Sequence, residues 1–221
     1  MSDAVKRTYS SPLRAEQAQV TRRAIVSAAA RLFVDRGYGA TTVDAIAEAA
    51  GVSRKTVFTS VGGKIEALKL ARDWAVVGDD RPVPVLDRPQ VRRAEQEPDA
   101  RKILREYVDF FSETCGRGAQ LHRVIESSSG VDADVRALAE EGRAQRRVGM
   151  SSLAALLAAR GALRLDLILD HAVDLLWLYN DPVIYTRLVL DRGWTVARFA
   201  DWLYETMLAQ LIRPGYRPRK S

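Results

Sequence analysis

The stretch TTVDAIAEAAGVSRKTVFTSVGGK, residues 41–64, decides how the N-terminal part of this chain folds. Its first half predicts a short helix, for which Thr41 or Thr42 is a good N-cap. Asp44 puts a negative charge in the first turn, where the helix dipole favours it. The apolar side chains of this helix fall on one face at helical spacing. Gly51 then supplies a turn that ends the helix.

A second short helix is predicted from Arg54 to about Ser60, with Ser53 as its N-cap. Its inward position is Val57, and its outward face carries the polar and basic side chains of Arg54, Lys55, Thr56 and Thr59. Two helices joined by a glycine-containing turn, the second with a basic outer face, form the helix-turn-helix pattern. In that pattern the second helix enters the major groove of DNA.

Positive charge is concentrated near the start of the chain. The sequence has 221 residues and a net charge of +6, and residues 1–70 contain eleven Lys or Arg against six Asp or Glu. A basic N-terminal block on a mildly acidic remainder indicates a polyanionic partner for the first segment. A merely solvated basic surface is the alternative, and the helix-turn-helix pattern argues against it.

The composition narrows the class of protein. Hydrophobic residues make up 47% and charged residues 28% of the chain, as in ordinary globular proteins. The apolar runs are too short for a membrane span, and no signal peptide is evident. The single cysteine, Cys115, excludes an internal disulfide, fits the cytoplasm, and is expected to be a small buried side chain. No enzyme motif and no cofactor-binding motif is present.

A third helix is predicted before the motif, from about Leu13 to Arg36, with Gly37 as its end. It would brace the two helices that follow, giving a compact DNA-binding head at residues 14–62. Residues 1–13 are expected to form a flexible arm, whose basic side chains could reach DNA.

The sequence RRAIVSAAARLFVDRGYGATTVDAIAEAAGVSRKTVFTSVGGKIEAL, residues 22–68, resembles the N-terminal domain of the TetR family of bacterial transcriptional regulators. The resemblance rests on the alanine-rich first helix and on the Ala-Gly-Val-Ser turn at residues 50–53. It implies that phosphates are held by Thr42, Thr56 and Lys64. It also implies that base edges are read by Arg54, Lys55 and Thr59, while Ser53 caps the helix rather than reading bases.

The chain departs from this family at the end of the second motif helix. Phe58 stands where the family usually has a tyrosine whose hydroxyl contacts a phosphate, so it keeps the packing and loses that hydrogen bond. Val61 stands where a phenylalanine is usual. Gly62-Gly63 replaces a Pro-Ser or similar pair, which predicts a looser turn into the next helix.

The rest of the chain is predicted to be helical, so the fold class is all-α: a three-helix helix-turn-helix head plus a larger helical ligand-binding and dimerisation body. The resemblance implies that a helix at 63–78 connects the head to the body. Four prolines without a helical period predict a loop at 79–98. The helical body at 99–212 precedes a basic tail at 213–221. Its expected helices lie at 99–115, 117–127, 132–160, 166–179, 182–192 and 196–212.

Two segments of the body are more apolar than the outer helices of a monomer need to be, 166–179 and 196–212. This favours burial on two sides, by the core and by a second subunit. The resemblance implies a homodimer interface of four helices at this place. A central helix in a monomer is the alternative. Two-fold symmetry would suit a palindromic operator in double-stranded DNA.

An internal pocket for a mainly apolar ligand is a further hypothesis. Its candidate lining residues are Tyr107, Phe110, Phe111, His122, Glu126, Met150 and Trp177. Aromatic residues at helical spacing more often form a plain core, which is the alternative. His122 and Glu126 lie one turn apart, but no third metal ligand is evident, so no metal site is predicted.

These patterns lead to one functional hypothesis and two rivals. The favoured one is a cytoplasmic, homodimeric transcriptional regulator, a repressor that a small, mainly apolar effector releases from its operator. The first rival is a helical DNA-binding regulator without effector sensing. The second is a helical enzyme with an accessory DNA-binding head.

Overall fold

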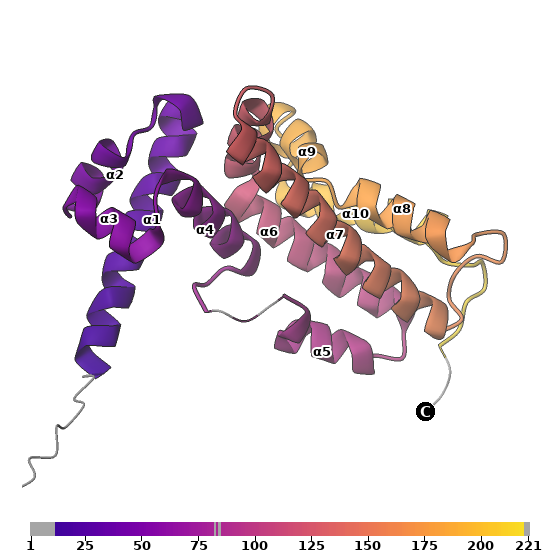
Figure 1. The fold of residues 1–221 in the computed structure, drawn as a ribbon. Helices are drawn as coiled ribbons and strands as arrows, with labels where there is room; N and C mark the ends of the chain where they lie inside the picture. The colour runs from indigo at the N-terminus through magenta and orange to yellow at the C-terminus, as the bar shows by residue number, and fades with distance from the viewer. Residues whose placement is uncertain (1–11, 82, 84, 219–221) are drawn as a thin grey trace, which may run out of the picture. The chain divides into compact units, whose positions relative to one another are not determined.

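The computed structural model describes residues 12–81, 83 and 85–218, which form ten α-helices, one 3-10 turn and one π-helical segment. Within these residues there is no strand, only an isolated bridge between Leu163 and Ile212, so the all-α prediction is confirmed. The helices divide into two compact units, separated in the chain between Ala71 and Arg72 (Figure 1). The predicted N-terminal arm lies, up to residue 11, outside the described residues.

The N-terminal unit consists of the helices α1 Pro12–Ala40, α2 Val43–Ala50, α3 Arg54–Val61 and the first half of α4 Lys64–Val77. Gly37 has a φ of 80° and breaks the regular geometry of α1, so the predicted end of the helix at Arg36 is where the kink begins. Side chains of α1 are mostly exposed up to Ala24, and burial starts at Ile25.

The N-terminal core joins α1 to both motif helices. Ile25 and Phe33 of α1 are fully buried, as are Ile46 of α2 and Val57 of α3. Thr41, also buried, donates its hydroxyl to the carbonyl oxygens of Gly37 at 2.8 Å and Leu32 at 3.2 Å. This hydrogen bonding fixes the end of α1 next to the start of α2.

The C-terminal unit contains the rest of the helices. They are η1 Val85–Asp87, α5 Pro89–Gln96, α6 Ala100–Ser129, α7 Ala133–Ala159, α8 Leu169–Tyr179, α9 Pro182–Tyr185, the π-helical segment η2 Thr186–Asp191 and α10 Val196–Leu211. Long helices α6 and α7 lie side by side, and α8, α9 and α10 pack against them. The core between α6, α7 and α10 includes the fully buried residues Leu104, Val108, Leu157, Leu203 and Met207. None of the described helices is long and apolar enough to cross a membrane.

The prediction of a loop at 79–98 is wrong in its second half, because Pro89–Gln96 forms helix α5. Pro89 stands in the first turn, where a helix needs no backbone N–H and where the fixed φ of proline suits the geometry. At the other end the guanidinium of Arg160 donates to the carbonyl oxygens of Glu95 and Glu97, the latter at 2.9 Å. A residue that breaks helices in their interior therefore starts one here.

The predicted break between helices at 99–115 and 117–127 is also wrong, because α6 runs without interruption from Ala100 to Ser129. Gly118 is explained by packing rather than by a turn. A Cβ atom at this position would lie only 3.1 Å from the Cβ of Ala75, on the last turns of α4. Glycine allows the two helices to approach closely at this point.

Two smaller differences concern the ends of the body. Helix α8 begins at Leu169 rather than at 166. The first residues of the tail predicted at 213–221 pack against the body, because Tyr216 is buried. Its hydroxyl donates to the carbonyl oxygen of Pro98 and accepts from the N–H of Ala100, both at 3.2 Å. The tail residues Arg219 and Lys220 lie outside the described residues.

Candidate DNA-binding site

The two motif helices are capped at the positions that the sequence indicates. The hydroxyl of Thr42 accepts a hydrogen bond from the N–H of Ala45 at 3.1 Å, and that of Ser53 accepts one from Thr56 at 3.1 Å. Between the helices Gly51 adopts a left-handed conformation, with φ 67° and ψ 32°, which glycine reaches without steric cost. The turn angle between α2 and α3 is therefore set by three local features of the sequence.

Helix α3 has one buried and one exposed face. Val57 and Val61 are buried, whereas Arg54, Lys55 and Thr59 are exposed. The hydroxyl of Thr59 donates back to the carbonyl oxygens of Lys55 and Thr56, so it can still accept from a ligand. The exposed face thus offers two cations and a hydroxyl in a helix short enough to lie in a groove.

Arg54 is held by a residue of the other motif helix. Its Nη1 donates to both carboxylate oxygens of Asp44, at 2.9 and 3.1 Å, although both side chains are exposed. The guanidinium also lies 5.7 Å from the ring centroid of Phe58. Asp44 also lies in the first turn of α2, where the helix dipole favours it, but the sequence does not predict this pair, because ten residues separate the two partners. The ion pair orients Arg54 on the outer face of α3.

Thr56 is half buried, and its hydroxyl is 2.8 Å from the Ser53 hydroxyl. Lys64, the first residue of α4, places its ammonium 3.9 Å from the centroid of the Tyr38 ring. Tyr38 is itself buried against Phe33, with 5.6 Å between ring centroids.

The end of α3 shows what the departures from the family pattern do. Phe58 is 45% exposed and carries no hydroxyl. Gly62 has a φ of 102°, and a Cβ there would come within 2.9 Å of Cγ of Glu66. Gly63, also at positive φ, lets its backbone lie against the Phe58 ring. The two glycines therefore make a specific turn that other residues would strain.

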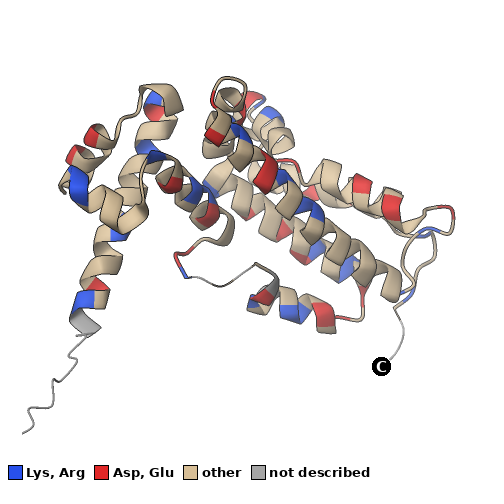
Figure 2. Cartoon of the chain, viewed as in Figure 1, with Lys and Arg blue, Asp and Glu red and all other residues tan. Residues whose placement is uncertain are grey.

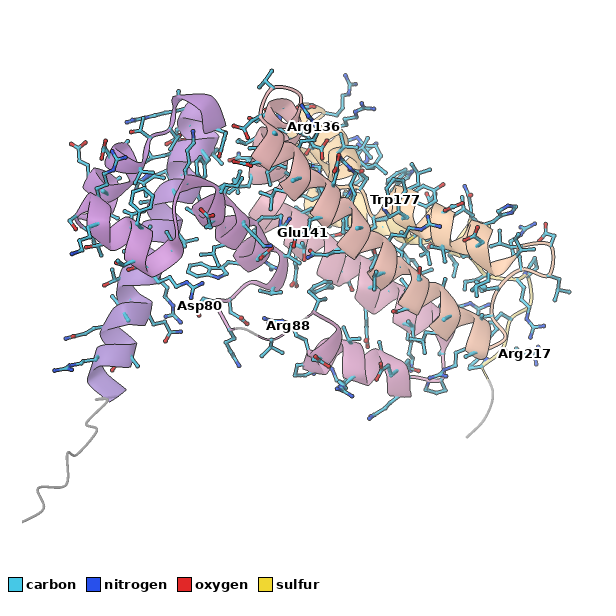
Figure 3. All side chains as sticks on the ribbon, in the orientation of Figure 1. Asp80, Arg88, Arg136, Glu141, Trp177 and Arg217 are labelled. Carbon is cyan, nitrogen blue, oxygen red and sulfur yellow. The ribbon has the colours of Figure 1, made fainter. Side chains whose placement is uncertain are left out.

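Five of the seven residues predicted to line a pocket fall into three groups. Tyr107 and Phe111 stack with 6.3 Å between ring centroids, and the Tyr107 hydroxyl lies 3.3 Å from the sulfur of Met150. Trp177, on α8 (Figure 3), donates its indole N–H to the carbonyl oxygen of Arg143 at 3.3 Å. Phe110 is one helix position away from Phe111, on the side of α6 that carries Thr114, whose hydroxyl donates to Val76.

His122 and Glu126 belong to a polar cluster that the sequence analysis captured only in part. Nε2 of His122 is 3.4 Å from Nη1 of Arg146, and Nη2 of Arg146 donates to Asp181 at 3.3 Å. Glu126 accepts from Arg143 at 3.0 Å. Burial, and then the positive charge of Arg146, lower the pKa of His122. The missed signal was Arg146 itself, an arginine one turn before the buried Met150 and so on the same inward face of α7.

Two further observations concern site chemistry. Among the residues that the structure describes, no three His, Cys, Asp or Glu side chains are grouped as a metal site requires. Cys115 is buried on α6, as expected, and burial raises the pKa of its thiol. A thiol in that state is a poor nucleophile.

Residues 25–64 match the family model described as bacterial regulatory proteins, tetR family. No curated protein matches the chain. One similar solved structure is NalD of Pseudomonas aeruginosa, described as the secondary repressor of the MexAB-OprM multidrug efflux pump. It is 21% identical with a TM-score of 0.65, over 90% of this chain and 100% of that one.

Two other solved structures resemble the chain. A putative transcriptional regulator from Saccharomonospora viridis, in complex with choline, is 21% identical with a TM-score of 0.64, over 86% of this chain and 97% of that one. The fatty acid degradation regulator FadR from Bacillus halodurans is 16% identical with a TM-score of 0.62, over 90% and 97%. At identities this low, the similarity to these structures shows a shared fold and nothing more. Residues 25–64 thus form a helix-turn-helix domain that matches the tetR family of bacterial regulatory proteins, in a chain that shares the fold of these regulators.

Proposed function

We propose that the protein is a cytoplasmic homodimeric repressor, which binds a palindromic operator through α3 and leaves it when a small molecule binds the C-terminal unit. The observation that carries the proposal is the exposed face of α3, where Arg54 and Lys55 stand on a helix capped at Ser53 and fixed by the buried Val57. A capped helix with charged residues facing outward suits insertion into a major groove.

Within that interface we assign two kinds of contact. Arg54, Lys55 and Thr59 would read base edges, since all three lie on the exposed face of α3. Thr42, Thr56 and Lys64 would hold phosphates, which fixes the position of α3 but carries no sequence information. Phe58 would add apolar contact with the sugar-phosphate backbone, and Ser53 would act through its cap.

Dimerisation is supported by the exposed apolar side chains around α8. Ala172, Val173 and Leu176 face the core, while Ile168 is 60% and Leu178 54% exposed on another side. Leu165, just before the helix, is 92% exposed, and Val196 of α10 is 44% exposed. Apolar side chains on both sides of a helix favour a partner on the second side. A second copy is the natural partner, because a palindrome needs two identical readers.

Release by a small molecule is supported by the relatives. One structural neighbour is complexed with choline, and NalD represses a multidrug efflux pump. An effector would act by favouring a conformation in which two α3 helices no longer match the operator. Its effect is limited by its difference in affinity between the two conformations.

The proposal is tested by selecting binding sites from random DNA with the full-length protein. We expect enrichment of a palindrome whose half-sites lie about 34–36 Å apart, one helical turn. The double variant Arg54→Ala with Lys55→Ala should enrich nothing, whereas Arg92→Ala, at an exposed position of α5, should select the same site. Enrichment of no palindrome by the wild-type chain would contradict the proposal.

A regulator that binds DNA without sensing an effector is the second candidate. It is favoured by the buried state of Phe111 and Met150, which pack as ordinary core residues. A panel of small molecules added to the protein–operator complex discriminates the two candidates. Release by at least one compound supports the repressor with an effector, and release by none supports the second candidate.

A further inference from the structure

A cluster of charged and polar side chains joins three helices of the C-terminal unit. It contains His122 and Glu126 of α6, Arg143 and Arg146 of α7, and Asp181, the N-cap of α9. Figure 2 shows charges of both signs along α7. Most ion pairs of this helix lie at the surface, but the side chain of Arg146 is only 18% exposed. Arg146 and His122, each 18% exposed, are thus the least exposed side chains of the cluster.

Arg146 is poorly satisfied by the protein. Its Nε is buried and has no hydrogen-bond partner among the described residues. Its two other contacts are long, 3.4 Å to Nε2 of His122 and 3.3 Å to Oδ2 of Asp181. A guanidinium has five N–H donors, and burying a donor without an acceptor is costly. Such a group in a native protein needs an explanation, and an acceptor supplied by water, an ion or a ligand is one.

A second hydrogen-bond donor near Arg146, the hydroxyl of Tyr107, also lacks a strong acceptor. The Tyr107 hydroxyl donates to the thioether sulfur of Met150 at 3.3 Å, which is a weak acceptor. Met150 lies one turn after Arg146 on α7, so the phenol and the guanidinium are on the same side of that helix. Burial raises the pKa of the Tyr107 hydroxyl, and the positive charge of Arg146 opposes this only in part. Two donors with weak or missing acceptors thus lie close together.

The surroundings on either side are apolar and aromatic. Phe111 stacks on Tyr107, and Trp177 packs against the core near Arg143. The chain after Asp181 is also unusual, because Thr186–Asp191 is π-helical and the buried hydroxyl of Thr186 has no described partner. Segments of π-helix occur often at functional sites. A ligand with an apolar part and one group of acceptor oxygens fits this combination.

We propose that Arg146 is the anchor for the carboxylate of an apolar organic acid, which is the effector class of this protein. The carboxylate would accept from Nε and Nη2, the edge of the guanidinium that binds carboxylates in a bidentate manner. The Tyr107 hydroxyl would be its neighbour. This inference rests on the proposed release by a small molecule and names the chemistry of that molecule.

A bound carboxylate would compete with Asp181 for Arg146, which would change the contact between α7 and α9. Its Oδ2 now occupies Nη2 of Arg146, while its Oδ1 accepts from the N–H of Val183 at 2.9 Å and caps α9. A bound carboxylate would take over Nη2 and leave Asp181 with its capping role alone. The contact between α7 and the start of α9 would then be broken by the ligand.

Binding of matched acids and alcohols to the full-length protein tests the inference. The probes are butyrate, octanoate, dodecanoate and phenylacetate, each compared with the alcohol of the same carbon skeleton by calorimetry and thermal shift. We expect at least one acid to bind and its alcohol to bind much more weakly. Arg146→Gln should reduce the affinity for that acid roughly tenfold to a hundredfold, the loss typical of hydrogen bonds to a charged group.

Two further variants control the result. Arg147→Gln alters the adjacent arginine, which is 49% exposed and paired with Asp174 at 2.9 Å, and should bind the acid like the wild-type protein. Asp181→Asn removes the competing carboxylate and keeps an N-cap, so it should bind the acid more tightly. Circular dichroism checks the fold of each variant. If Arg146→Gln does not fold, the acid–alcohol comparison and Asp181→Asn decide.

Three results would overturn the inference: no acid binds, an acid and its alcohol bind equally, or Arg146→Gln binds as well as the wild-type protein. DNA selection with the same preparations separates this failure from that of the proposed function. A protein that selects a palindrome but binds no acid refutes the inference alone. A protein that binds acids through Arg146 but selects no DNA site refutes the proposed repressor alone.

Discussion

Arg54 is the side chain whose loss should change sequence preference most. It lies on the exposed face of α3 and is oriented by Asp44 of α2. If it reads a guanine, Arg54→Ala should cost about 1–3 kcal/mol on the selected site and relax specificity at one base position. Fluorescence anisotropy with the selected site and its single-base variants measures both effects. An equal loss on every sequence would make Arg54 a phosphate contact.

Lys64→Ala supplies the contrast for that experiment. Its ammonium rests on the Tyr38 ring at the start of α4, and the resemblance to the TetR family implies that it contacts a phosphate. The variant should bind all sequences more weakly and lower the slope of log affinity against log salt by about one. An unchanged salt slope would remove Lys64 from the interface.

His122 should make the stability of the protein sensitive to acid. Burial and the charge of Arg146 lower its pKa below the ordinary value of 6.5, while Asp181 and Glu126 oppose this and Arg143 adds to it. Below pH 6.5 the unfolded chain therefore binds a proton that the folded chain resists, and stability falls as the pH drops toward the folded-state pKa. Above pH 6.5 the effect is absent.

Thermal melts of the wild-type protein and His122→Gln between neutral and mildly acidic pH measure this effect. The melting temperature of the variant should fall less steeply with acidification. His171→Gln, at an exposed position of α8, controls for the loss of a histidine. Identical slopes for wild type and His122→Gln would show that His122 does not couple folding to pH.

For single residues, the local sequence predicts helix N-caps well but predicts ion pairs between residues far apart in the sequence poorly. Thr42 and Ser53 could be assigned as caps, because a cap bonds to a backbone N–H three residues away. The pair of Asp44 with Arg54 and that of Arg146 with Asp181 could not, since they form only when separate helices are brought together. The burial of Arg146 could have been predicted, because it lies one turn before the apolar Met150 on the inward face of α7.

Among the elements, the turn between α3 and α4 depends on Gly62. Its φ is 102°, and a Cβ would approach the Glu66 side chain within 2.9 Å. Gly62→Ala should therefore destabilise the protein by about 1–2 kcal/mol, the cost of a positive φ for a residue with a side chain. The midpoint of urea unfolding, followed by circular dichroism, measures this change.

Gly39→Ala is the matched control, because a Cβ there meets nothing within 4 Å and its φ is not positive. It should leave the urea midpoint unchanged or raise it slightly. If both variants unfold at the same urea concentration, the turn at Gly62 is not the constraint that its geometry indicates.

Glycine and proline residues explain where the sequence predicts the ends of helices correctly and where it does not. Gly51 ends a helix, and the sequence pattern around it is sufficient to show this. Pro89 was predicted to lie in a loop but starts α5, and Gly118 lies inside a continuous α6 where two helices were predicted. The C-terminal end of α5 is held by Arg160, and Gly118 packs against Ala75, both from distant parts of the sequence. Proline restricts the backbone and glycine frees it, but neither residue type alone determines whether the fold uses it to start, end or pack a helix.

For the whole molecule, association through α8 should depend on Leu178. Burying a leucine contributes about 1.5–3 kcal/mol, and two-fold symmetry counts each side chain twice. Leu178→Asp should therefore shift the protein to monomers in sedimentation experiments. Val131→Asp, at an apolar position that is 90% exposed between α6 and α7, should leave the dimer intact. A dimer that survives Leu178→Asp would place the interface elsewhere.

The central claim is that two copies of α3 read two half-sites at a fixed distance. The most direct test is the affinity of the full-length protein for its selected site after half a helical turn of DNA is inserted between the half-sites. We predict that specific binding falls to the non-specific level, which is typically at least about 10³-fold weaker. Unchanged affinity for the spaced site would contradict the account, because it would mean that each chain reads DNA independently.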